Sequence, residues 1–190
     1  MNITNKKIIL ASGSPRRQQF LKELLLDFEI KLKPVEEIYP NELKAEEITD
    51  YLSQLKAVPF KSNLNENEVI ITSDTIVWHN NKALGKPKNK QEAFEMLKSY
   101  TNQWHDVISS VCFTTKQKQI IKNYSTRVHF KDLTDQEIEF YIDQYQPFDK
   151  AGAYGIQEWI GLIGIDKIEG SYFNVVGLPC HLVYETIKSL

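Results

Sequence analysis

The sequence predicts an α/β protein built on a mixed β-sheet, and three observations carry this prediction. Short apolar runs that suit strands alternate with helix-like patterns through the first half of the chain, as in α/β proteins. In the middle, two strand-like runs flank the polar stretch KQKQ, which indicates a hairpin and therefore antiparallel pairing. The chain has 190 residues, 42% hydrophobic and 25% charged, which suits one domain with a substantial core.

The first elements have clear local signals. Residues 7–11 form an apolar run that predicts a strand, and the turn after it ends in Ser14 and Pro15. Serine is a good N-cap and proline suits the first helical position, so we expect a helix over 15–26. The elements expected next are a strand at 28–33, a helix at 45–58, a strand at 68–78, a helix at 89–100, strands at 105–115 and 120–130, a helix from the capping box of Thr134 and Glu137 to Tyr145, a Gly-rich loop, strands at 160–168 and 172–176, and a helix from Pro179 to the end.

Charge and composition argue against several classes of protein. The formal net charge is −2, whereas a general nucleic-acid binder carries a basic excess. Nothing resembles a signal peptide or an apolar span of about 20 residues, so we expect a cytoplasmic protein without a membrane partner. Cys112 and Cys180 lack metal or redox spacing and are expected to be small, buried side chains.

Two of the three arginines, Arg16 and Arg17, are adjacent in the first turn of the first expected helix. The helix dipole disfavours positive charge there and favours anions. One interpretation is a pair of solvated surface arginines. The other is an anion site, in which both guanidinium groups and the free N–H groups of the helix start bind phosphate oxygens.

Carboxylates form a second candidate group. Asp74 interrupts an apolar strand pattern, where a carboxylate is costly unless it is paired or holds a metal. It is therefore either a metal ligand or general base, or an acid paired with a lysine. Glu36 and Glu37 are an exposed acidic turn or, beside Asp74, part of an oxygen-rich Mg²⁺ site. Lys56 ends an amphipathic helix, where a cation suits the dipole.

Two glycine-containing segments are candidates for ligand contacts. Lys86 lies in LGKP, a turn from which a lysine can reach a phosphate as a point charge. The stretch FDKAGAYGIQ contains Lys150 and Gln157 beside glycines that allow close backbone approach to a ligand. The Gln157 amide both donates and accepts, so it suits a nucleobase edge. Each segment is alternatively an ordinary surface loop.

The segments ILASGSPRRQQFL, VEE, LKA, SDT, LGKP, KAGAYGIQ and VVGLP occur in the order and spacing of one known family. Through them the chain resembles the Maf family of nucleoside triphosphate pyrophosphatases, over essentially all of residues 1–190 as a single domain. The resemblance implies an elongated mixed sheet flanked by helices, related to the inosine triphosphate pyrophosphatases. It also implies hydrolysis of a nucleoside triphosphate to the monophosphate and pyrophosphate with a divalent metal, Mg²⁺ or alternatively Mn²⁺ or Co²⁺.

The loop KAGAYGIQ is similar to the branch of the family that acts on dTTP and UTP, rather than the 7-methyl-GTP branch. This resemblance implies that Asp74 is the catalytic base and that Arg16, Thr75 and Gln157 determine specificity. The family usually has glycine after G-I-Q, whereas this chain has Glu158. That departure leaves the nucleobase preference less settled than the reaction.

The sequence therefore predicts one site with divided roles. Ser12, Arg16 and Arg17 are expected to hold the triphosphate, and Lys56 and Lys86 to offset the remaining phosphate charge. Lys150 is expected among the substrate-binding residues, and Asp74 with Glu36 or Glu37 is expected to place the metal. Two alternatives remain: a nucleotide-binding regulator of cell division without turnover, and a 7-methyl-GTP pyrophosphatase. A homodimer is a further expectation from the family, and no nucleic-acid polymer is expected as a partner.

Overall fold

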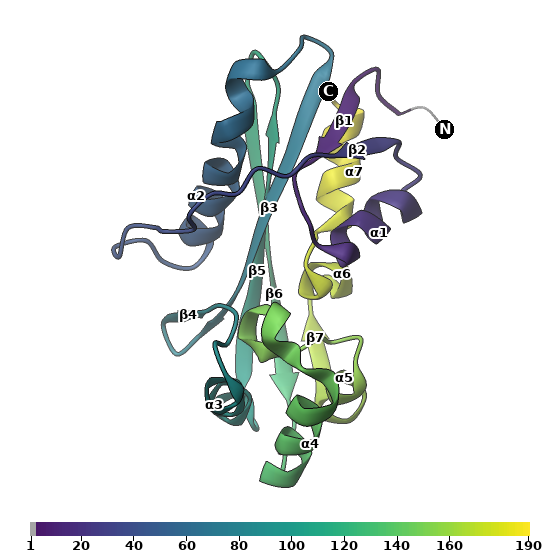
Figure 1. Ribbon diagram of the computed structural model, residues 1–190. Coiled ribbons are helices and arrows are strands. Elements are labelled where there is room, and N and C mark those ends of the chain that lie inside the picture. Colours follow the sequence, from purple (N-terminus) through teal and green to yellow (C-terminus); the bar gives the residue numbers. More distant parts are fainter. Residues whose placement is uncertain (1–2) are drawn as a thin grey trace. The chain divides into compact units, whose positions relative to one another are not determined.

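A computed structural model describes residues 3–190 (Figure 1). The strands are β1 (Lys7–Leu10), β2 (Phe28–Ile30), β3 (Glu68–His79), β4 (Lys82–Leu84), β5 (Trp104–Thr114), β6 (Gln119–Phe130) and β7 (Ile165–Glu169). The α-helices are α1 (Pro15–Glu23), α2 (Glu46–Ala57), α3 (Lys90–Tyr100), α4 (Asp135–Tyr145), α5 (Trp159–Gly164), α6 (Tyr172–Val176) and α7 (Cys180–Lys188). Short 3-10 helices are η1 (Val58–Asn63), η2 (Pro147–Asp149) and η3 (Ala151–Ala153).

The strands form one seven-stranded mixed sheet in the order β2-β1-β3-β5-β6-β7, with β4 paired to β3. β1 is parallel to β2 and β3, whereas β4 is antiparallel to β3 and β7 is antiparallel to β6. The expected hairpin is formed by β5 and β6, whose turn is closed by a 2.9 Å bond from the Thr115 N–H to the Lys118 carbonyl. The α/β class and the mixed sheet are confirmed.

The chain divides into two compact units. Unit 1 comprises Met1–Asp74, Ser109–Tyr124 and Gly177–Leu190, and unit 2 comprises Thr75–Ile108 and Ser125–Val176. The strands β3, β5 and β6 pass through both units, and the boundary within β3 falls between Asp74 and Thr75. Within residues 3–190, no helix is long and apolar enough to cross a membrane.

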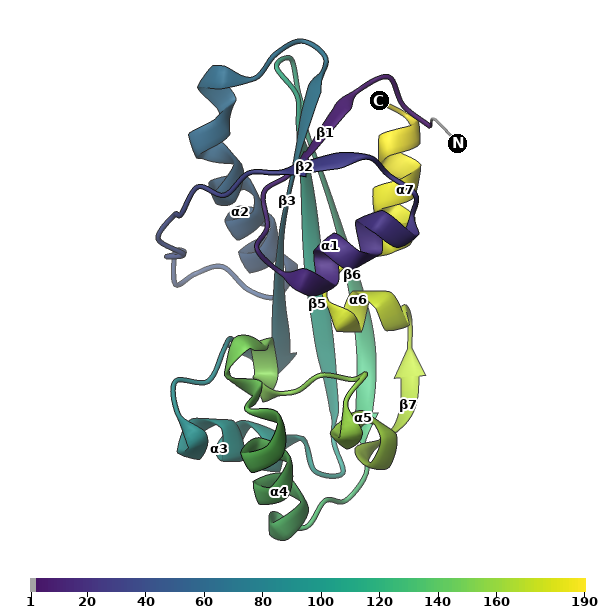
Figure 2. The same ribbon diagram turned by 45° about the vertical axis from the view of Figure 1, so that its right-hand side comes forward.

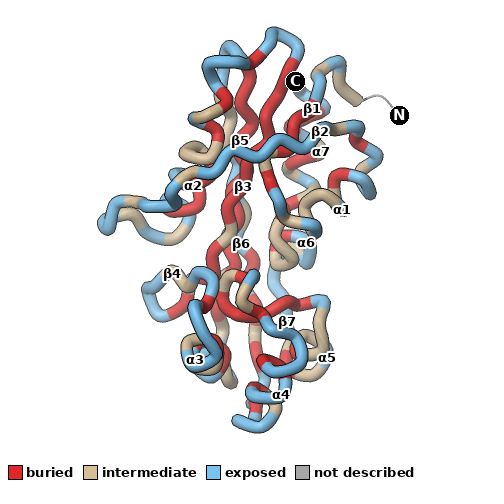
Figure 3. Tube along the Cα trace, viewed as in Figure 1, coloured by how far each residue is buried: buried red, intermediate tan, exposed pale blue. Residues whose placement is uncertain are grey.

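Unit 1 buries both faces of its part of the sheet. On one face α1 and α7 lie together and pack through Leu21 and Val183 against strand residues such as Ile71 (Figure 2). On the other face Phe60 of η1 packs against Ile70. Neighbouring residues of β3, such as Ile70 and Ile71, therefore pack into clusters on opposite faces of the sheet, because successive side chains of a strand point to opposite faces. Every residue of Glu68–Asp74, the part of β3 in unit 1, is buried, and Figure 3 shows β3 as a largely buried strand.

Unit 2 has its own core between α3, α4 and its strand segments, with Leu97, Tyr141 and Phe130 among its fully buried residues. The Gly-rich loop contributes to this core through Tyr154, whose hydroxyl lies 2.7 Å from His105 Nε2. Burial lowers the pKa of His105 to about 3, so the imidazole is neutral. The loop is thus attached to the core at its centre.

One expected strand was wrong in part and another was wrong throughout. Residues 160–164 belong to α5, and only 165–169 form a strand. Within 160–164 the buried positions are Ile160 and Gly164, four residues apart, while Leu162 is 81% exposed, which is helical spacing. Residues 172–176 are helix α6 rather than a strand, because Ser171 begins a helical turn by accepting the Val175 N–H at its carbonyl.

Helix α1 also ends before its expected boundary. It was predicted to extend to residue 26 and ends at Glu23, because Leu25 takes a left-handed φ of 56°. The Ser14 N-cap is confirmed, since its side chain accepts the Arg17 N–H. Boundary differences of this size do not move the predicted site residues to other elements.

Gly152→Ala is expected to destabilise the protein. Gly152 has a φ of +70°, and an added Cβ would lie 2.4 Å from Val77 Cγ2 and 2.8 Å from the Tyr100 hydroxyl. Backbone strain and overpacking together should lower the free energy of unfolding by about 2–4 kcal/mol. Urea denaturation measures this, with Gly85→Ala as the control because no heavy atom lies within 4 Å of its added Cβ. Equal stability of the two variants would contradict the packing described for the loop.

Candidate active site

In unit 1, three charged side chains meet at the Lys56 ammonium. Asp74 lies at the end of the unit 1 segment of β3 and is only 6% exposed. Lys56, in the last turn of α2, places Nζ 2.6 Å from Asp74 Oδ1 and 3.1 Å from Glu37 Oε2. The cation in the last turn of α2, Lys56, thus contacts a buried carboxylate of β3, Asp74. The structure thus shows the pairing of Asp74 with a lysine that the sequence left as one alternative, and the same lysine also contacts Glu37.

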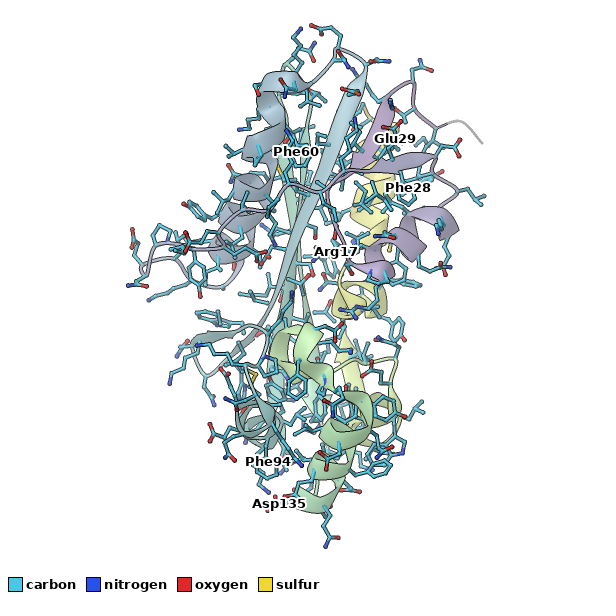
Figure 4. All side chains as sticks on the ribbon, in the orientation of Figure 1. Arg17, Phe28, Glu29, Phe60, Phe94 and Asp135 are labelled. Carbon is cyan, nitrogen blue, oxygen red and sulfur yellow. The ribbon has the colours of Figure 1, made fainter. Side chains whose placement is uncertain are left out.

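Arg17 is attached to the same segment of β3 by its side chain. Its Nη1 donates to the Ser73 carbonyl at 2.8 Å, and its Nε donates to the Gly177 carbonyl at 3.0 Å. Figure 4 labels Arg17 at the start of α1, where Ser14 and Pro15 set the direction of the helix. The guanidinium thus bonds the carbonyl of the residue immediately before Asp74 and fixes the strand at that point.

The pKa of Asp74 is set by burial acting against two neighbouring cations. Burial raises the pKa of the Asp74 carboxyl, and the charges of Lys56 and Arg17 oppose this effect without cancelling it. Burial also lowers the pKa of Arg17, again opposed by the nearby Asp74 carboxylate. A carboxyl group whose pKa is raised binds a proton more strongly, and it is therefore suited to accept one during catalysis.

The same carboxylates are the residues that fit a divalent cation. Asp74 and Glu37 already converge on one cation, the Lys56 ammonium, and carboxylate oxygens are the ligands that Mg²⁺ prefers. Within residues 3–190, no group of three or more His, Cys, Asp or Glu side chains forms a complete protein site. Of the two glutamates left open by the sequence, Glu37 is the one that contacts the Lys56 ammonium, which also contacts Asp74.

Two other predicted residues of unit 1 lie at the start of α1. Ser12 is buried, and its hydroxyl accepts the Ser14 N–H at 3.3 Å. Arg16 is partly exposed in the first turn of the helix. Ser12, Arg16 and Arg17 therefore all belong to the connection from β1 to α1 and the first turn of that helix.

In unit 2, the two glycine-containing segments lie together. The Gly152 N–H donates to the Gly85 carbonyl at 2.9 Å, which joins the KAGAYGIQ loop to the turn containing Lys86. Lys86 and Gln157 are both exposed. Thr75, the first residue of unit 2, is partly exposed on β3.

Lys150 is buried and engaged by carboxylates. Its Nζ lies 2.7 Å from Asp149 Oδ1 and 3.1 Å from Glu158 Oε1. The Glu158 carboxylate also accepts the Tyr141 hydroxyl proton, and that hydroxyl accepts the Gly155 N–H at 3.0 Å. The sequence analysis noted Glu158 as a departure from the family pattern but missed Tyr141. In the sequence, Tyr141 is one apolar position of a helix, and nothing there indicates its contacts with Glu158 and Gly155.

Comparison with known proteins agrees with the sequence motifs. The model of the family described as "Maf-like protein" matches residues 7–190. The chain belongs to the Maf family. It is 62% identical to a protein of Flavobacterium johnsoniae named dTTP/UTP pyrophosphatase, over 97% of this chain and 95% of that protein. It is 47% identical to the dTTP/UTP pyrophosphatase of Bacteroides fragilis, over 100% of this chain and 98% of that protein.

A solved structure supports the fold independently of close sequence similarity. The Staphylococcus aureus Ham1 protein aligns with a TM-score of 0.57 at 14% identity, over 97% of this chain and 99% of that chain. The expected Maf fold is therefore confirmed.

Asp74→Asn should change how stability depends on pH. Because the pKa of Asp74 is raised from 3.8 in the folded state, the unfolded chain loses this proton first as pH rises. As pH rises from the pKa of Asp74 in the unfolded chain to its higher pKa in the folded protein, the wild-type free energy of unfolding should fall relative to that of the variant. The difference should grow by about 1.4 kcal/mol for each unit of the pKa shift and then stay constant.

Urea denaturation of both proteins from pH 3.5 to pH 8 measures this difference. Asp27→Asn, which removes an exposed carboxyl in the same unit, is the control for the loss of one negative charge. A difference that shrinks as pH rises would mean that the ion pair outweighs burial at Asp74.

Proposed function

We propose that this protein hydrolyses dTTP and UTP to the monophosphate and pyrophosphate. The observation that carries the proposal is the buried Asp74 carboxyl, whose pKa is raised and which pairs with Lys56. Arg17 donates a hydrogen bond to the carbonyl of the preceding residue, Ser73. The names of relatives 44–62% identical over nearly the full chain supply the substrate. The raised pKa suits Asp74 to accept a proton from water.

In the proposed reaction a water oxygen attacks the α-phosphorus and Asp74 takes the water proton. The bond from the α-phosphorus to the oxygen that bridges it to the β-phosphorus breaks, and the electron pair leaves with pyrophosphate. Lys56, which touches Asp74, is placed to offset negative charge as it develops near this carboxylate. A divalent cation, when bound to Asp74 and Glu37, would supply electrostatic stabilisation of the phosphate oxygens.

The remaining residues receive separate roles. We assign triphosphate binding to Arg16, with the N–H groups at the start of α1 and Ser12, since anions are stabilised there. Arg17 is assigned as a positioning residue, because its guanidinium bonds the Ser73 and Gly177 carbonyls. In unit 2, exposed Lys86 is assigned to phosphate, and Gln157 and Thr75 to the pyrimidine nucleotide.

We also propose a cytoplasmic location, where nucleoside triphosphates are made and used, and one functional domain for the whole chain. The family match over residues 7–190 supports the latter. A homodimer stays a prediction.

Asp74→Asn should reduce kcat for dTTP by at least 10³-fold, because an amide cannot accept the water proton. Binding of dTTP should remain measurable by calorimetry. Pyrophosphate release with Mg²⁺ is the assay, tested against dTTP, UTP, CTP, GTP and 7-methyl-GTP, and Asp27→Asn is the control. Retention of most of the kcat would remove Asp74 from this role, and activity on 7-methyl-GTP alone would refute the pyrimidine assignment.

Lys56→Met should move the acidic limb of the pH–rate profile to higher pH. The Lys56 ammonium is the largest influence that lowers the pKa of Asp74 against burial, so its loss raises that pKa further. The base is then deprotonated only at higher pH. The measurement is kcat for dTTP from pH 5 to pH 9, with exposed Lys44→Met as the control. A limb that stays in place would show that the observed titration belongs to another group.

A further inference from the structure

We infer that Glu158 is a positioning residue that fixes the Gln157 loop through Tyr141 and Lys150. The inference rests on the proposed function, because it explains how the loop assigned to the nucleotide keeps its shape. Glu158 directly follows Gln157 and occupies the N-cap position of α5. Its side chain is 18% exposed and bonded at both oxygens.

The first link runs from the carboxylate to the loop backbone. Tyr141 of α4 donates its hydroxyl proton to Glu158 Oε2, and the oxygen of the same hydroxyl accepts the Gly155 N–H at 3.0 Å. Burial and the Glu158 carboxylate raise the pKa of Tyr141, so the hydroxyl keeps its proton and remains a donor. With the proton directed to Glu158, a lone pair of the hydroxyl is available for Gly155.

The second link places Glu158 beside Gln157. A Cβ built on Gly155 would lie 2.8 Å from Glu158 Cδ and 3.1 Å from Gln157 Nε2. Both side chains therefore lie on the same side of Gly155, and a larger residue at 155 would displace them. Within residues 3–190 no hydrogen bond is made by the Gln157 amide, while residues 155 and 158 on either side of it are held.

The third link is electrostatic. The buried Lys150 ammonium lies between the exposed Asp149 carboxylate at 2.7 Å and the Glu158 carboxylate at 3.1 Å. With two anions in contact, Lys150 is neutralised within the protein. Through these two contacts Lys150 connects residue 149, before the loop, with residue 158, after it. A glycine at 158 would remove both the anion and the acceptor for Tyr141.

The experiment compares Glu158→Ala, Glu158→Gln and Tyr141→Phe with the control Glu139→Gln, an exposed glutamate on α4. Amide hydrogen exchange at Gly155 in the free protein reads the loop without reference to activity. Binding of dTTP in chelator and the KM and kcat for dTTP and UTP read its consequence. Thermal melts check that each variant is folded.

Glu158→Ala and Tyr141→Phe should raise the rate of Gly155 amide exchange at least tenfold. Both the Kd and the KM for dTTP should rise at least fivefold, while kcat changes less than twofold. Glu158→Gln keeps an acceptor for Tyr141 and should restore exchange to within about threefold of wild type. The double variant Glu158→Ala with Tyr141→Phe should be no worse than the stronger single one, because both break the same chain of bonds.

Unchanged Gly155 exchange in Glu158→Ala would overturn the inference. So would faster exchange, or a lower melting temperature, with dTTP binding and KM unchanged, since that result describes a purely structural residue. If wild type binds dTTP but releases no pyrophosphate, the proposed function fails while exchange and binding still decide the role of Glu158. If wild type neither binds nor hydrolyses any triphosphate, both proposals fail.

Discussion

The burial of one carboxylate, that of Asp74, is the constraint on which the arrangement of unit 1 depends. An isolated carboxylate in an apolar strand is costly, so cations must reach it. Helix α2 ends with Lys56 in contact with its Oδ1, and Arg17 at the start of α1 bonds the preceding carbonyl. The helices α1 and α2 are thus both bonded to β3, at the neighbouring residues Ser73 and Asp74. The residual rise in the Asp74 pKa shows that this compensation is incomplete, which is the property that a proton acceptor requires.

In unit 2 the main constraint is the conformation of the glycine-containing loop KAGAYGIQ. Glycine loses more conformational freedom on folding than other residues, so such a loop needs specific bonds to stay in one shape. The bonds come from side chains buried in the unit's own core: Tyr154 meets His105, and Tyr141 meets the Gly155 N–H. One exposed side chain, Gln157, is left beside this framework. A polar group on a rigid support discriminates between ligands better than one on a mobile loop, because little freedom is lost on binding.

Much of the fold followed from local signals, and the failures have local causes. The Ser14 cap, the Thr134–Glu137 capping box and the hairpin at KQKQ were predictable, because each depends on residues close in sequence. The strand expected at 160–168 failed because an apolar run has the same composition in a buried strand and a short helix. Only the exposure of Leu162 shows which face is buried.

The site divides in the same way. Sequence alone singled out Asp74, Lys56 and the acidic turn, but the choice of Glu37 over Glu36 depends on which side chain reaches Lys56 in three dimensions. Tyr141 was not predictable, because its hydroxyl acts on residues 14 and 17 positions away.

The adjacent arginines show how a local conflict should be interpreted. Two positive charges at a helix start break a rule, and a broken rule points to function. For Arg17 the protein itself resolves the conflict, because its guanidinium donates to the Ser73 and Gly177 carbonyls. The conflict at this residue therefore does not require a bound anion. The argument for an anion site passes to Arg16 and the N–H groups beside it, while Arg17 holds the strand that carries Asp74. In the proposed mechanism, binding and positioning thus fall to consecutive residues of one motif.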